Sequence, residues 1–240
     1  MGAQWKHAGR LASANKRGAV FGKLVKEILV AAKVGDPNPD NNARLRAAVE
    51  AAKKQSVPRD TIERAIKKGS GQLDEQVIYE TVLYEGFAPH KVPVIVECLT
   101  ENKNRTASEV RLLFRKGQLG SMGSVAWMFD RMGVVEATHQ DKTLDPEGVA
   151  IEAGAQNVEA LDKEDLGGAG VGARFFSDAT DLDSVSKFLT KAGWTVTMSE
   201  LSYIAKNNSE ISDEQRKEVA EFLNAIDDND DVHRIYVAMK

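Results

Sequence analysis

The chain has 240 residues, enough for one large domain or for two to three small ones with buried cores. Its single cysteine, Cys98, excludes an internal disulfide, so nothing in the composition requires an oxidising compartment. The longest clear apolar run, around residues 92–96, falls far short of the roughly 18 residues that cross a bilayer, which predicts a soluble protein without a membrane partner.

The overall formal charge of −4 conceals two oppositely charged parts. Residues 1–70 contain 15 Lys and Arg against 6 Asp and Glu, a net +9, whereas the other 170 residues contain 17 against 30, a net −13. A basic part in an acidic chain is typical of a surface that binds a polyanion. The structural alternative is a solvated lysine-rich surface, which many helical proteins carry.

Three amphipathic helices are predicted in the basic part. Residues 15–33 form the first because apolar side chains recur there at helical spacing. Asn38-Pro39 supplies a cap and a first helical residue for the second. Residues 56–58 start a short third helix, which ends before a hinge at residues 69–71. The pattern predicts a basic three-helix domain over residues 1–75.

The apolar stripes of these helices leave many basic side chains for solvent or a ligand. Cations that neutralise phosphates release condensed counterions, so binding through them is salt-dependent and largely indifferent to sequence. Trp5 and His7 either stack on an unpaired base or fill the helical bundle. The predicted nucleic-acid contacts in this domain are Lys16, Arg17, Lys23, Lys26, Arg44, Arg46, Lys53, Lys54, Arg59, Arg64, Lys67 and Lys68.

Residues 79–130 hold the clearest α/β pattern. Alternating apolar and β-branched side chains predict strands over residues 79–87, 92–99 and 124–129. Pro93 indicates an edge position or a first residue that donates no ladder bond. Thr106 or Ser108 starts a helix between the second and third strands. The segment Asn104-Arg105-Thr106 is interpreted either as a turn that caps this helix or as a site where Arg105 and Arg111 extend a phosphate-binding surface.

A second α/β pattern follows. Strands are predicted over residues 132–137, 172–176, 194–204 and 232–237, and helices over 145–155, 181–192 and 212–226. The last helix and strand supply what residues 79–130 lack. We therefore predict an α+β fold in which the basic helical domain precedes two α/β sandwich-like (ferredoxin-like) domains. The middle domain contains residues 76–132 plus 206–240, and residues 133–205 form a third domain inserted in it.

No catalytic or metal-binding constellation stands out, and no cofactor is predicted. The glycine-rich residues 167–172 precede a strand and lack the Lys-Ser/Thr pair of a phosphate loop, which favours a flexible loop. The aspartates within residues 227–231 lack the glycine and distal glutamate of a calcium loop, so an acidic helix-to-strand turn is preferred. The four histidines are scattered without zinc-ligand spacing.

Several motifs carry a resemblance to a known family. They are KRG at 16–18, FGKLVKEI at 21–28, NPDNNARLRAAVEAAK at 38–53, VPRDTIERAIKK at 57–68, YEGF at 84–87, VECLTENKNRT at 96–106, EVR at 109–111 and GSVAWMFD at 123–130. In order and spacing they resemble the YebC family, which includes mitochondrial translational activators. The resemblance implies a three-domain protein, with the same inserted arrangement, that binds nucleic acid and regulates gene expression. It does not imply an enzyme.

The charge of the amino-terminal residues bears on the cellular compartment in which the protein is expected. Its first 26 residues contain six basic and no acidic side chains, as an organellar transit peptide does. The family-like motifs begin by Lys16 inside the same segment, which leaves little to cleave and favours a cytoplasmic bacterial protein. Only Trp5, Lys6 and His7 match the glycine-histidine-serine-lysine-tryptophan lead of the family.

Three functions remain as hypotheses. The first is a non-catalytic, DNA-binding regulator of the kind that the resemblance implies. The alternative, which the resemblance also implies, is a translation factor that binds ribosomal RNA and acts on ribosomes stalled at proline-rich stretches. Less favoured is an enzyme or ligand-binding protein with its site in a cleft between domains. The sequence has no recognisable helix-turn-helix or zinc finger, which disfavours sequence-specific promoter binding. It gives no oligomeric state.

Overall fold

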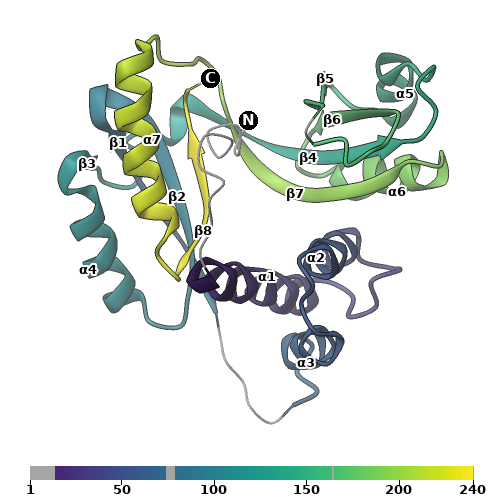
Figure 1. The fold of residues 1–240 in the computed structure, drawn as a ribbon, viewed down its shortest axis with the longest axis horizontal. Coiled ribbons are helices and arrows are strands. Elements are labelled where there is room, and N and C mark those ends of the chain that lie inside the picture. The colour runs from purple at the N-terminus through teal and green to yellow at the C-terminus, as the bar shows by residue number, and fades with distance from the viewer. Residues whose placement is uncertain (1–13, 74–78, 164, 240) are drawn as a thin grey trace. The chain divides into compact units, whose positions relative to one another are not determined.

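A computed structural model describes residues 14–73, 79–163 and 165–239, and Figure 1 shows their arrangement into elements. Three helices precede two four-stranded antiparallel sheets, each with its own helices, which confirms the predicted α+β fold. The chain divides into two compact units. One holds the described residues of 1–23, 76–130 and 203–240, and the other those of 24–75 and 131–202. The exact domain boundaries given above stay a prediction.

The three helices are α1 (Ala14–Val34), α2 (Ala43–Lys54) and α3 (Arg59–Gly69). The predicted start of the second helix at Asn38 is wrong. The cap is Asn42, whose side-chain oxygen accepts the N–H of Leu45 at 3.0 Å. Among the described residues no helix is both long and apolar enough to cross a membrane.

A close backbone approach fixes the end of α3. An added Cβ at Gly69 would lie 2.3 Å from the carbonyl oxygen of Leu29 on α1, so only glycine fits there without displacing the backbone. The helix end thus packs directly on α1.

The first sheet has the strand order β3-β1-β2-β8. Its strands are β1 (Glu80–Ala88), β2 (Val92–Thr100), β3 (Gln118–Leu119) and β8 (Val232–Val237). The helices α4 (Lys103–Leu113) and α7 (Asp213–Asp227) lie against one face (Figure 1). Three short 3-10 helices complete this part: η2 (Pro89–Lys91), η3 (Phe114–Lys116) and η4 (Ala126–Met128). The last helix and strand therefore return to this sheet, as predicted.

Both faces of this sheet are covered by apolar side chains. On the helix side, Val94 and Val96 of β2 share a core with Phe114 and with Phe222 of α7, whose rings meet edge to face at 5.4 Å. On the other side, Ile95 packs with Val125, Phe129, Tyr236 and Ala238. β2 is therefore buried on both faces, which explains its nearly continuous run of apolar residues.

Three local predictions in this part need correction or refinement. α4 begins at Lys103, before the predicted Thr106 or Ser108, because Asn102 accepts the N–H of Arg105 as its cap. Pro93 is not on an edge strand, since β2 pairs with both β1 and β8; it is the second residue of its strand. The predicted strand over residues 124–129 is wrong. That segment is a loop and the 3-10 helix η4, and the next strand begins at Phe129.

The second sheet has the order β5-β6-β4-β7. Its strands are β4 (Phe129–His139), β5 (Asn157–Ala160), β6 (Val171–Ser177) and β7 (Thr195–Ala205), and its helices are α5 (Pro146–Ala153) and α6 (Leu182–Lys191). The core joins Val135 and Phe175 of the sheet to Val185 and Leu189 of α6. Asp145 caps α5 as predicted, whereas the short β5 was not predicted.

Candidate nucleic-acid interface

The buried face of the three N-terminal helices is made of alanine and branched aliphatic side chains, which lets the helices approach closely. Its residues, each exposed by 8% or less, are Ile28, Leu29, Val30, Ala31, Ala32, Ala43, Leu45, Ala47, Ala48, Val49, Ala52, Val57, Ile62 and Ala65. No predicted cation is among them. The basic side chains are therefore surplus to the core, as the sequence pattern indicated.

Two of the predicted cations make structural contacts: Arg44 ties α2 to α1, and Arg46 ties α2 to the connection before it. Arg44 donates from Nε to Oε1 of Glu27 at 2.7 Å and from Nη2 to Oε2 at 3.2 Å, a two-pronged ion pair with a buried carboxylate. Arg46 donates from Nη1 to the carbonyl oxygens of Pro39 and Asp40 at 3.4 and 3.3 Å. Both arginines thus order the α1–α2 connection, and a contact with nucleic acid stays a prediction for them.

The cations of α1 differ in their surroundings. Lys23 is half-buried, and its Nζ lies 3.0 Å from Oδ1 of Asp227. Lys26 is also half-buried. Lys16 and Arg17 belong to the helix, but their side chains lie outside the described residues. Lys33, in the last turn, is exposed although it is not among the predicted contacts.

The exposed predicted cations gather on α2 and α3. They form what we call the α2–α3 basic surface: Lys53, Lys54, Arg59, Arg64 and Lys67. Lys68 beside them is half-buried. Lys53 pairs with Glu50 and Arg59 with Glu63, each at 2.7 Å, but these are neighbouring residues on exposed helix faces. Such pairs contribute little to stability, so a phosphate can replace the carboxylate at small cost.

Chain connectivity brings part of this surface together. Lys53 and Lys54 occupy the last turn of α2, and Arg59 begins α3 after a connection of only four residues, 55–58. Lys67 lies about two turns further along α3, roughly 12 Å away by helix geometry. The structural alternative for the lysines in the last turns is that they complement the negative end of each helix dipole.

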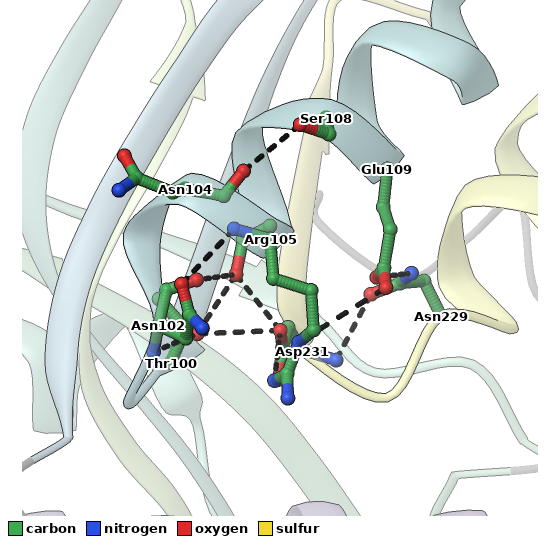
Figure 2. A network of polar contacts seen from close by, with 9 residues as sticks. Thr100, Asn102, Asn104, Arg105, Ser108, Glu109, Asn229 and Asp231 are labelled. Carbon is green, nitrogen blue, oxygen red and sulfur yellow. Dashed lines mark hydrogen bonds and ion pairs between the residues drawn. The ribbon is translucent and has the colours of Figure 1, made fainter.

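The polar segment before α4 forms a compact network around a buried aspartate (Figure 2). Asp231 precedes β8 and is only 4% exposed. Its Oδ2 accepts from Nη2 of Arg105 at 2.7 Å, from Oγ1 of Thr106 at 2.8 Å and from Oγ1 of Thr100 at 3.2 Å. Thr106 Oγ1 also lies 2.7 Å from Thr100 Oγ1. One carboxylate thereby links the end of β2, the start of α4 and the start of β8.

A second pair of contacts extends this network. Asn229 donates from Nδ2 to Glu109 at 2.8 Å and accepts the N–H of Asp231 at 2.9 Å (Figure 2). The hydrogen bond to Asp231 raises the pKa of the Arg105 guanidinium, which stays charged. These contacts favour the structural interpretation of the segment. The nucleic-acid role of Arg105, and of exposed Arg111, stays a prediction.

A buried glutamate organises the loop that the sequence suggested as a strand. Glu85 on β1 is 7% exposed. Its Oε1 accepts the N–H of Gly123 at 2.8 Å, and its Oε2 accepts those of Val125 and Ala126 at 2.9 and 2.8 Å. Because these donors point at a carboxylate, they are not available to a strand ladder. We call residues 120–128 the Glu85 loop.

The same contacts set the ionisation of Glu85. Burial raises the pKa of the carboxyl, but the three backbone N–H groups together outweigh it and hold the pKa below its ordinary value. The carboxylate is therefore charged at neutral pH. It is a structural group that sequence reasoning missed; the only signal was an acid within a mostly apolar strand.

Replacing Glu85 by Gln should loosen the loop. The NH2 group of the glutamine side chain would then face backbone N–H groups of the loop, and two donors cannot bond each other. We expect a loss of about 2 kcal/mol of stability at pH 7. Since the folded-state pKa is lowered, this stabilisation is present above the unfolded value of about 4.3 and is lost as the pH falls through the folded value. Urea unfolding of both proteins across pH 3–7 should show a difference that shrinks on acidification. If the difference in stability between the two proteins did not change with pH, the lowered pKa of Glu85 in the folded protein would be contradicted.

Other candidate sites gain no support from the described residues. No three metal-ligating side chains converge in the described part of the chain. The glycine-rich segment is a loop in which Gly167 and Gly168 have φ of 59° and 90°, followed by β6. Asp231 of the acidic turn is engaged by the network around Arg105.

The comparisons with known proteins agree along the chain. A family model described as the TACO1/YebC N-terminal domain matches residues 3–72, and one described as the TACO1/YebC second and third domain matches residues 79–239. Proteins named probable transcriptional regulatory protein from Bdellovibrio bacteriovorus and Pseudomonas savastanoi are 53% and 52% identical over 100% of this chain and 100% and 99% of their own. The crystal structure of a conserved hypothetical protein from Aquifex aeolicus is 37% identical, has a TM-score of 0.80 and covers 99% of this chain and 96% of its own. The chain therefore belongs to the TACO1/YebC family.

Proposed function

We propose that this protein is a non-catalytic regulator of gene expression that binds DNA through the phosphate backbone. The observation that carries the proposal is the separation of charge, with a net +9 in residues 1–70 and exposed cations on α2 and α3. The names of the relatives, probable transcriptional regulatory proteins, support a role in transcription. The cations lie on rigid helices, so little conformational order is lost on binding.

Binding of this kind recognises phosphates and not base sequence. Lys and Arg on an exposed helix face neutralise phosphates, and the released counterions make affinity fall steeply with salt. Base-edge readout requires side chains that reach into a groove with fixed geometry. The α2–α3 basic surface offers mainly point charges, which fits backbone contacts.

Ribosomal RNA is the second candidate ligand, because it offers dense phosphate to the same surface. The two ligands can be separated by co-sedimentation with ribosomes over a salt series, with and without excess duplex DNA. If the protein is DNA-directed, DNA should release it from ribosomes at every salt concentration. Retention on ribosomes despite the DNA would establish the translation factor instead. Failure to bind either ligand at low salt would contradict both candidates.

A further inference from the structure

A group of cations without acidic neighbours in the sequence lies at the end of α4. Residues 110–129 contain no acidic side chain and three basic ones, a local net charge of +3 in the part of the chain after residue 70, whose net charge is −13. The three cations are Arg111, Arg115 and Lys116, and all of them are exposed. We call them the α4–η3 basic surface. Its charge is opposite to that of the acidic part to which it belongs, so overall composition does not explain it.

Neighbouring cations in the same compact unit pair with carboxylates. Lys103, at the start of α4, forms an ion pair with Glu80. Arg105, one residue pair further on, donates to the buried carboxylate of Asp231 at 2.7 Å. By contrast, no carboxylate of the described residues lies within ion-pairing distance of the α4–η3 basic surface. Its three cations are therefore available to an anion from outside.

The backbone that carries the last two of these cations is fixed by packing. Phe114 begins the turn η3, is 3% exposed and meets the ring of Phe222 edge to face at 5.4 Å. The N–H of Gly117 donates to the carbonyl oxygen of Phe114 at 3.0 Å. An added Cβ at Gly117 would lie 2.3 Å from the carbonyl oxygen of Phe87, so the end of the turn packs directly on β1. Binding to cations on a fixed backbone costs little conformational order.

The spacing of the cations suits a phosphate backbone. Arg111 and Arg115 are four residues apart, about one helical turn or roughly 6 Å along the axis, and so they lie on the same side. Each strand of duplex DNA carries one phosphate per roughly 3.4 Å of its axis, so this length matches about two phosphates of one strand. A guanidinium also donates two parallel hydrogen bonds to a phosphate, which an ammonium does not.

The structural alternative is that these cations complement the negative end of the α4 dipole. Arg111 lies in the last turn of α4, and the other two follow directly in η3. The two interpretations predict different results. A role in the dipole alone predicts that neutralising the cations lowers stability and leaves nucleic-acid affinity unchanged, whereas a binding surface predicts a loss of affinity in a folded protein.

We propose that the α4–η3 basic surface is a second contact for the phosphate backbone of a nucleic acid, in addition to the α2–α3 basic surface. This inference rests on the proposed function, since it takes a nucleic acid as the ligand. It assigns Arg111 to this contact and leaves Arg105 out, because Asp231 holds the guanidinium of Arg105. It also predicts a steeper dependence of affinity on salt than the α2–α3 basic surface supplies by itself.

The test measures binding of duplex DNA by fluorescence anisotropy over a salt series, for the wild type and for a variant carrying R111Q, R115Q and K116Q. Near physiological salt the variant should bind about tenfold more weakly. The slope of log affinity against log salt should become shallower by about two to three, since each phosphate contact contributes about 0.9 to it. If the variant loses stability in urea but keeps the affinity and the slope of the wild type, the dipole explains the cations and the inference is overturned.

A matched variant and a chemical footprint locate the contact. K142Q, K163Q and K191Q change the net charge by the same amount at other exposed positions, so affinity and slope should change far less. In the wild type, duplex DNA should slow the acetylation of Lys116 but not that of Lys142. Equal acetylation of Lys116 with and without bound DNA would contradict the contact.

Failure of this inference is distinct from failure of the proposed function. If a variant of the α2–α3 basic surface loses binding while R111Q, R115Q and K116Q together leave affinity unchanged, the second contact is refuted and the proposed function stands. If the wild type does not bind duplex DNA even at low salt, both fail.

Discussion

A variant carrying K53E, K54E and K67E should bind nucleic acid on the order of 100-fold more weakly than the wild type near physiological salt. Each lysine removed takes away a phosphate contact and its counterion release, and each glutamate repels the phosphate. The three side chains are exposed and lie outside the apolar stripes, so the fold should persist. Fluorescence anisotropy over a salt series should show a shallower slope of log affinity against log salt.

A matched variant controls for total charge. Lys142, Lys163 and Lys191 are exposed on the part of the chain that forms the second sheet and its helices. Their replacement by Glu changes the net charge by the same amount but leaves the α2–α3 basic surface intact, so affinity should change much less. Equal losses in both variants would show that only overall charge matters. Full affinity in a folded K53E, K54E and K67E variant would remove these lysines from the site.

Asp231→Ala should destabilise the part of the chain built on the first sheet by about 1–3 kcal/mol, the usual cost of leaving a buried hydrogen-bond donor without its acceptor. The change removes the acceptor shared by Arg105, Thr100 and Thr106. The two threonine hydroxyls lie in a buried environment, so they lose a partner that water cannot replace. The midpoint of urea unfolding, followed by circular dichroism, measures the effect.

The neighbouring aspartate provides the control. Asp230 is exposed in the same turn, so Asp230→Ala should change stability far less. Asp231→Asn tests the charge separately, because it keeps the size but turns an amide toward the guanidinium of Arg105. If Asp231→Ala costs no more than Asp230→Ala, the network does not hold β8 to α4.

The fold was largely predictable because its elements have strong periodic patterns. β2, α6 and α7 are long and regular, and their boundaries agree with the predicted ones within one or two residues. The error at residues 124–129 has a specific cause. The alternation of Val125, Trp127 and Phe129 is typical of a strand, but Glu85, about forty residues earlier, takes the N–H groups that a ladder would need. A local pattern does not contain that competition.

The candidate site was predictable as a charge distribution but not residue by residue. Arg44 and Lys54 look equivalent in the sequence, since each lies off the apolar stripe of the same helix. Only the structure shows that Arg44 meets Glu27 of α1, whereas Lys54 is exposed. The structural roles of Glu85 and Asp231 could hardly be predicted from the sequence, because their hydrogen-bond partners come from distant segments.

The position of β8 in the first sheet also bears on the order in which the chain folds during synthesis. β2 leaves the ribosome long before β8, and the whole second sheet is made between them. Until α7 and β8 emerge, one side of β2 has no hydrogen-bonding partner, and its apolar residues lack the cover of α7. A nascent chain in that state has an exposed sheet edge, the feature that invites association between chains. Completion of the first sheet therefore depends on β8, which is translated after the whole second sheet.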